Sequence, residues 1–302
     1  LIFVSIPYFN ISLEEISALI EIKSPLDLLD KTEKISSLLK NTNGNLEIFH
    51  PSFKEFILDY IKSKGLYKYY SERLGEYYLG KEDIIQATYL LIDSNPKKIK
   101  DYLLPVYRNY IEWGELKFGL KILNTKLNFT SDNFERGYIY YHLSEVNNLL
   151  GHKDEFTRCI DESLSYLHDS DTPFYSAALM YKAINLTQNG EIEEANKTVT
   201  IAFDKLGNDQ TINRAFLLVN LSKICVDISE YEKGANACKE AFEIFQKEKH
   251  IEGIFNSLIN LVSCLGQMDG YRDEAEKYAL ILLEKIADSD NFAYEIIILN
   301  SL

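Results

Sequence analysis

The segment Gly75–Lys81 comes nearer to a catalytic motif than any other part of the chain. It fits the GxxxxGK portion of a phosphate-binding loop, in which backbone N–H groups surround the phosphates and the lysine reaches them. However, Glu82 stands where a serine or threonine must hold magnesium, and the bulky Tyr77 and Tyr78 occupy positions that must stay open around a phosphate. No buried-strand pattern precedes the segment. We therefore expect no phosphate loop here.

Most histidines and all cysteines lack the spacing that metal or nucleophilic chemistry requires. The cysteines fall singly in helical patterns without a CxxC pair, which is typical of reduced, buried thiols. No nucleophile–base pair stands out either. The sequence predicts no catalytic site and no metal site, so we expect that this chain is not an enzyme. The residues considered are His142, His152, His168, His250, Cys159, Cys225, Cys238 and Cys264.

The remaining histidine, His50, lies where the local structure is expected to change. Leu46–His50 predicts one short strand, and Pro51 opens an apolar helical pattern. An imidazole at a helix N-terminus can donate to an anion together with the N–H groups of the first turn. Such a hydrogen bond to a phosphate contributes roughly 1.5–3 kcal/mol, which biases a two-state equilibrium about 10- to 150-fold. The alternative is a histidine with a purely local structural role.

The residues before His50 predict a small helical unit. Ser12 is a suitable N-cap and Glu15 holds the capping-box position of a first helix. Pro25 suits the first turn of a second helix that ends near Lys40, and Asn41–Asn45 is a strong turn signal. Together these elements predict a winged-helix unit with a short β element.

The sequence Phe49-His50-Pro51-Ser52-Phe53 resembles a motif of the STAND signalling ATPases, in the form found in their NACHT branch. The resemblance implies that the winged helix closes over a nucleotide-binding domain and that His50 reaches the β-phosphate of ADP. ADP or ATP, and the nucleotide-binding domain itself, would then belong to a parent protein, with no cofactor in this fragment. The family further implies oligomerisation on activation, and antiviral defence or transcriptional signalling as the setting.

A repeat is visible in the second part of the chain. A glycine or serine at a turn is followed five positions later by a marker residue, and the markers fall at 119, 156, 195, 234 and 275. These positions are 37 to 41 residues apart, a spacing that predicts antiparallel helix pairs stacked into a solenoid. The array resembles tetratricopeptide (TPR) repeats. We predict a mainly all-α fold: the winged-helix unit, then an α-solenoid of TPR-like helix pairs.

In the TPR family the first helix of each pair lines the concave groove. The resemblance places Glu145, Ile184, Lys223 and Ser263 there as protein-binding candidates. This mixed set does not support the two-carboxylate clamp of some TPR proteins, and ordinary packing between repeats is the alternative for each residue.

The charge limits the kinds of partner. The net charge is −14, and residues 101–302 contribute most of it, with 19 Lys and Arg against 32 Asp and Glu. An acidic surface repels nucleic acid and anionic lipid and favours basic or apolar protein partners, although a solvated face that maintains solubility is the alternative. No apolar run is long enough to span a membrane. We expect a cytoplasmic fragment of a longer protein.

The predicted organisation is a winged-helix domain at 1–64, connecting helices at 65–100 with a degenerate repeat around Ala87, and the repeat array at 101–302. The predicted function is the regulatory and ligand-sensing portion of a STAND ATPase, whose repeats bind a protein trigger. A plain TPR-like adaptor is the alternative. A DNA-binding regulator is disfavoured because the predicted recognition helix, Leu26–Lys40, has no arginine and almost no net charge.

Overall fold

The chain divides into two compact units, each described here by itself. The computed structural model describes residues 4, 6, 11–19, 38–42, 45–48, 50–168, 172–207 and 211–287. Unit 1 comprises Leu1–Tyr110 and Lys121–Phe129, and unit 2 comprises Ile111–Leu120 and Thr130–Leu302. The predicted boundaries at 64 and 100 stay a prediction.

Unit 1 contains a small antiparallel sheet with strand order β1-β3-β2. Its strands are β1 (Ile11–Ser12), β2 (Leu39–Thr42) and β3 (Asn45–Ile48), and α2 (Leu13–Leu19) follows β1 directly. The capping box at the start of α2 is confirmed, because the Ser12 backbone N–H donates to Glu15 Oε2 at 2.7 Å and the Glu15 N–H donates to Ser12 Oγ at 3.1 Å.

One sequence expectation in this region is wrong. Leu39 and Lys40, predicted as the end of a helix, belong to β2, which pairs with β3 from Leu39 opposite Ile48 to Thr42 opposite Asn45. The physical reason is the Asn-Gly dipeptide between the strands, which favours a two-residue hairpin turn. Residues 25–37 of the predicted second helix lie outside the described residues, and a winged-helix fold remains a prediction.

The remaining elements of unit 1 are helical. They are α4 (Pro51–Ser63), α5 (Tyr67–Gly80), α6 (Ile84–Ser94), the short 3-10 helix η2 (Pro96–Lys98), most of α7 (Leu103–Glu112) and the larger part of α8 (Leu116–Leu127). Arg73 on α5 donates to the Leu19 carbonyl at 2.6 Å, so the C-terminal end of α2 is held against α5.

Helices α5 and α6 pack on each other, and their origin as a degenerate repeat around Ala87 stays a prediction. Glu82, in the turn between them, has a left-handed φ of 60°, and Ala87 five residues later is fully buried. The Gly75–Lys81 segment lies largely within α5, where its backbone N–H groups serve the helix. It therefore has no phosphate-loop conformation.

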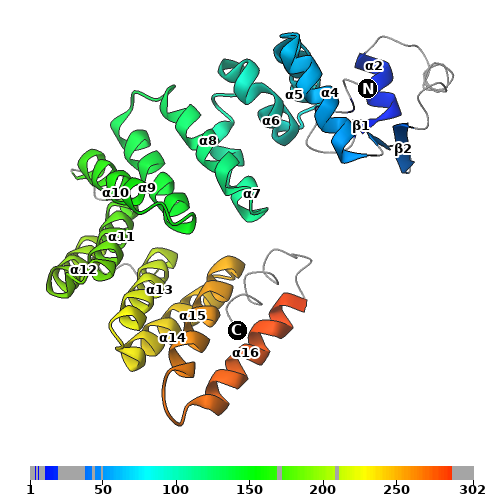
Figure 1. Ribbon diagram of the computed structural model, residues 1–302. Coiled ribbons are helices and arrows are strands. Elements are labelled where there is room, and N and C mark those ends of the chain that lie inside the picture. Colours follow the sequence, from blue (N-terminus) through cyan, green and yellow to red (C-terminus); the bar gives the residue numbers. More distant parts are fainter. Residues whose placement is uncertain are drawn as a thin grey trace. The chain divides into compact units, whose positions relative to one another are not determined.

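Unit 2 is a stack of TPR-like helix pairs (Figure 1). The first helices are α9 (Asn133–Leu149), α11 (Pro173–Gln188), α13 (Ile212–Asp227) and α15 (Ile251–Gly266). The second helices are α10 (Lys153–Leu167), α12 (Ile192–Leu206), α14 (Tyr231–Lys247) and α16 (Arg272–Ala287). The first helices α9, α11 and α13 each pack most extensively on their own second helix, whereas α15 packs more extensively on α14 than on α16. Helices α11 and α13 also pack directly on each other. The predicted mainly α-helical solenoid is confirmed.

The turns within the pairs adopt the conformation that the repeat requires. Gly114, Gly151, Gly190 and Gly270 have φ between 72° and 84°, and Ser229, which replaces glycine in its repeat, has φ 62°. A left-handed residue at this position ends the first helix and reverses the chain.

The marker residues fill the contact between the two helices of each pair. Phe156 and Ala195 are 1% exposed, and Gly234 is also buried. A Cβ added at Gly234 would lie 3.1 Å from Cys225 Cβ on α13 and 2.9 Å from Cys264 Sγ on α15, so α14 needs a residue without a side chain where it meets both its own partner helix and the next pair. All four cysteines are buried and free, as predicted. Within the described ranges, no helix has the length and hydropathy needed to cross a lipid bilayer.

Candidate functional site

The four predicted groove residues occupy matching positions, one on each first helix of unit 2. Glu145 lies on α9 with its side chain 39% exposed, and Lys223 on α13 and Ser263 on α15 are exposed. Ile184 on α11 is 4% exposed and belongs to a hydrophobic cluster with Phe156 and Met180. Ile184 therefore offers almost no surface to a ligand, and the other three present polar groups.

Lys223 is an exposed residue of α13 whose side chain is partly dehydrated by the protein atoms around it. Dehydration by these surroundings lowers the pKa of Lys223, and the negative charge of Glu145 opposes that shift. The structure thus brings Glu145 and Lys223 into electrostatic range, although α9 and α13 belong to alternate helix pairs.

Asn220 lies one turn before Lys223 and was not identified from the sequence. Its Oδ1 accepts a hydrogen bond from Lys223 Nζ at 3.5 Å, and the residue is 8% exposed. The only available signal was its position three residues before Lys223, because side chains at this spacing are neighbours on a helix. Its burial depends on other helices, which no local pattern reveals.

Glu145 is positioned by a histidine and a group of aromatic rings. His142 Nδ1 lies 3.1 Å from Glu145 Oε2, and the His142 side chain is 1% exposed. Ring centroids 4.5–6.2 Å apart connect this histidine with an aromatic cluster that joins α9 to α11. The aromatic cluster consists of Phe134, Tyr138, Tyr141, Phe174 and Tyr181.

The acidity of the array does not lie on the first helices. Helices α9, α11, α13 and α15 carry four Lys and Arg and four Asp and Glu, whereas α10, α12, α14 and α16 carry ten and fourteen. The remaining negative charge is in the connecting segments and outside the described helices. The first-helix face is therefore polar and aromatic with no net charge, and the acidic residues are concentrated elsewhere.

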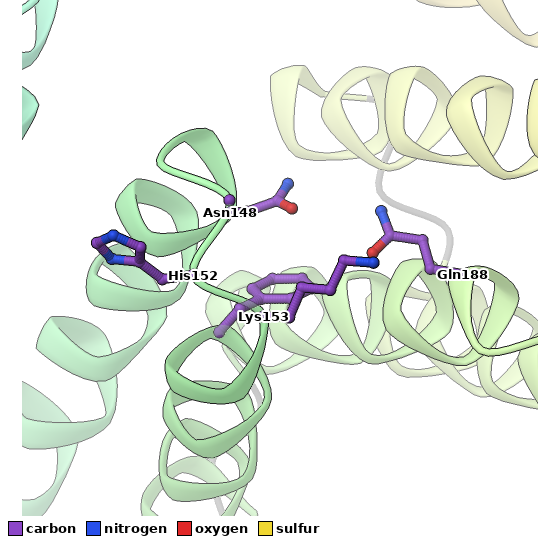
Figure 2. Close-up of a pocket in the computed structure, with 6 residues that line it drawn as sticks. Asn148, His152, Lys153 and Gln188 are labelled. Carbon is purple, nitrogen blue, oxygen red and sulfur yellow. The ribbon is translucent and has the colours of Figure 1, made fainter.

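A hollow lies beside the turn between α9 and α10. Its volume is about 280 Å³, and the buried ring of Phe156 contributes to its lining. In Figure 2 the side chain of Lys153 extends toward that of Gln188, while His152 points away from both. The other lining residues are Asn148, Gly151 and His152. The hollow is a partly open recess whose lining is both polar and apolar.

In unit 1, His50 stands at the predicted junction between a strand and a helix. It is the N-cap of α4 with φ −118° and ψ 124°, and its side chain is exposed and makes no capping hydrogen bond. Its carbonyl accepts from the N–H groups of Phe53 and Lys54, at 3.0 and 3.2 Å. The imidazole is therefore presented to the surface. Phe49, which also belongs to the motif, lies outside the described residues.

Among the described residues, no group of three or more His, Cys, Asp or Glu side chains could hold a metal ion.

Comparison with known proteins finds distant structural likenesses. No family model matches the sequence, and no curated protein does so. A putative kinesin light chain from Podosopora anserina with nearly identical TPR-like repeats is 14% identical over 65% of this chain and 98% of that chain, with a TM-score of 0.43. BtubC (BKLC) from P. vanneervenii is 13% identical over 67% and 87%, with a TM-score of 0.46.

A STAND protein with a tetratricopeptide repeat sensor from Pyrococcus horikoshii is 16% identical over 97% of this chain and 52% of that chain, with a TM-score of 0.42. The helix bounds and left-handed turns described above establish the fold of unit 2 itself: it is a scaffold of TPR-like helix pairs.

Proposed function

We propose that the first helices of unit 2 bind a segment of another protein. The observation that carries this proposal is the surface stripe of Glu145, Lys223 and Ser263, which occupy the same position in three of the four helix pairs, whereas Ile184 at that position of α11 is buried. A helix stack presents such a stripe as a continuous surface, because each pair packs on the next. The stripe also lacks the excess negative charge of the second helices, which makes it distinct from a merely solvated face.

A charge reversal on this stripe tests the proposal. Lys223→Glu should remove partners that the wild-type array captures by cross-linking in a cell extract and that mass spectrometry identifies. Lys197→Glu is the matched control, because Lys197 is exposed on the second helix α12 and its ion pairs with Glu193 and Glu194 are exposed. Identical captured proteins for wild type and both variants would show that the first-helix stripe is not the binding surface.

We further propose that the chain regulates a larger STAND ATPase through His50. The supporting observations are the motif from His50 to Phe53, the exposed imidazole, and its place at the N-terminus of α4. The backbone N–H groups and dipole at a helix N-terminus favour a nearby phosphate, and the imidazole adds a further donor. In this proposal His50 contacts ADP bound to a neighbouring domain and stabilises the inactive state.

The parent protein provides the test of the nucleotide contact. His50→Leu should lower the amount of ADP that co-purifies with the parent and raise its basal ATPase rate, by roughly 10-fold or more for one lost hydrogen bond to phosphate. His168→Leu is the control, because His168 is an exposed histidine at the end of α10. Unchanged ADP retention and basal activity in His50→Leu would remove the regulatory role and leave an adaptor.

A further inference from the structure

We propose that Cys238 and Cys264 form an oxidation site, at which a peroxide converts the two thiols into a reversible disulfide bond between α14 and α15. The proposal concerns unit 2 alone and depends neither on the proposed binding surface nor on His50. It starts from the distribution of the cysteines, because Cys225, Cys238 and Cys264 lie on the consecutive helices α13, α14 and α15.

Gly234 marks the point at which these three helices meet. A Cβ added there would lie 3.1 Å from Cys225 Cβ and 2.9 Å from Cys264 Sγ, so both cysteines are held against the same turn of α14. Cys238 lies one turn further along α14, on the same face as Gly234. Cys238 and Cys264 belong to one hydrophobic cluster, and both are fully buried. The absence of a side chain at Gly234 thus leaves room for Cys264 Sγ beside α14.

The thiols of Cys238 and Cys264 contact each other directly. Cys238 donates a hydrogen bond to the sulfur of Cys264, so the contact joins the third helix pair to the fourth. This hydrogen bond raises the pKa of Cys238 and lowers that of Cys264, because it stabilises a thiolate at Cys264. The thiolate is the form of cysteine that attacks an oxidant, and a neighbouring thiol can then resolve the oxidised product.

The reaction balances with a peroxide as the oxidant. The Cys264 thiolate attacks one oxygen of hydrogen peroxide, so that an S–O bond forms, the O–O bond breaks, and the released hydroxide takes up the former thiol proton to give water. The sulfur of Cys238 then attacks the sulfenic acid. An S–S bond forms, the S–O bond breaks, and the leaving hydroxide departs as a second water with the Cys238 proton. The two sulfur atoms together lose the two electrons that the peroxide oxygens gain.

Cys159 provides an internal control, because it is as deeply buried but is contacted by different groups. It is 1% exposed, and burial raises its pKa to about 11. Its sulfur accepts from Asn147 Nδ2 at 4.0 Å and from an Arg158 nitrogen at 3.9 Å, rather than from a thiol. A peroxide that merely enters the core of unit 2 would therefore have no reason to prefer Cys264 to Cys159.

Peroxide treatment of the intact chain tests the site. The protein is exposed to hydrogen peroxide at neutral pH, the remaining thiols are blocked with N-ethylmaleimide in urea, and mass spectrometry identifies linked peptides without reduction. The expected product joins Cys238 to Cys264, is lighter by two hydrogens than the separate peptides, and is cleaved by dithiothreitol, while Cys159 carries the maleimide. A link through Cys225, or oxidation of the pair no faster than that of Cys159, would overturn the proposal.

Variants separate the pair from general effects of the peroxide. Oxidation should raise the thermal midpoint of the wild type by about 5–10 °C, because the new bond constrains the unfolded chain, and dithiothreitol should reverse the rise. Cys238→Ala should abolish the rise and leave a sulfenic acid at Cys264 that dimedone labels. Cys225→Ala, the matched control from the same group of helices, should retain it. An undiminished rise in Cys238→Ala, or its loss in Cys225→Ala, would contradict the assigned pair.

Discussion

Single residues set how closely the helices of unit 2 approach one another. Gly253 at the start of α15 shows this most sharply, because an added Cβ would lie 2.3 Å from the ring of Phe245. That ring is fully buried and in contact with the rings of Phe216 and His250, so it has little room to move. Gly266, near the other end of the same helix, has no heavy atom within 4 Å of an added Cβ.

Gly253→Ala should therefore destabilise the protein by about 1–3 kcal/mol, as overpacking of a filled core does. Gly266→Ala should leave the free energy of unfolding unchanged or raise it by up to about 1 kcal/mol, because alanine favours helix over glycine. Urea unfolding followed by circular dichroism measures both. Equal effects of the two variants would mean that the Phe245 ring gives way without cost.

The buried thiols lead to a prediction about pH. Burial raises the pKa of Cys159 to about 11, compared with 9.0 for an ordinary thiol, so the folded state holds its proton more tightly than the unfolded state. The resulting stabilisation is complete below about pH 9 and is lost as the pH rises toward 11. Urea unfolding between pH 8 and 10.5 should show a smaller decline in Cys159→Ala than in the wild type. An equal decline would contradict the tight proton binding.

For single residues, the sequence predicted where each residue lies along a helix or strand better than it predicted which residues pack around it. It placed His50 at a strand–helix junction and Glu145 and Lys223 at matching helix positions, because these depend on local patterns. The burial of Ile184 and the contact between Asn220 and Lys223 depend on which helices pack together, and one helical period does not contain that information.

At the scale of elements, the turn within each helix pair is the most regular feature. Four turns use glycine in the left-handed region, but Ser229 adopts φ 62° with a side chain present. A left-handed conformation costs an ordinary residue roughly 1–2 kcal/mol. Ser229 is thus a strained residue at a position that glycine holds in the turns at 114, 151, 190 and 270.

Replacing Ser229 by glycine should stabilise the protein by about 0.5–1 kcal/mol, since glycine adopts this conformation without strain. Gly190→Ala should have the opposite sign and a similar size, because Gly190 has φ 82° and open space around it. Thermal unfolding of both variants provides the measurement. If Ser229→Gly lowered the melting temperature, its hydroxyl, 3.3 Å from the Tyr231 hydroxyl, would be more important than the strain.

The helix pairs were predictable because the glycine spacing indicates the turns and the helical periodicity indicates the helices on either side. The strand β2 was not, since Leu39 and Lys40 continue a helical pattern and become a strand only by pairing with β3. A pattern of apolar residues alone cannot decide between these two structures over so short a stretch.

At the scale of the whole molecule, the two compact units should respond to mutation separately. Leu74 in unit 1 and Leu258 in unit 2 are both fully buried, and the single tryptophan, Trp113, belongs to unit 2. Fluorescence therefore reports on unit 2, whereas circular dichroism reports on both units. In stacked repeats, stability depends mainly on neighbouring contacts.

Leu74→Ala should lower the denaturation midpoint seen by circular dichroism and leave the fluorescence midpoint unchanged. Leu258→Ala should lower the fluorescence midpoint, with each substitution costing about 2–5 kcal/mol locally. Coincident shifts of both signals in both variants would show that the chain unfolds as one cooperative body.

The left-handed turns also affect how the number of helix pairs in such a chain can change during evolution. Because each reversal is made by one residue and each pair packs on its neighbours through the same face, a duplicated stretch of about 39 residues would fit between existing pairs. Each duplication would add one more residue at the position held by Glu145, Lys223 and Ser263. Gene duplication could thus extend the recognition surface by one contact at a time, while the existing contacts keep their geometry.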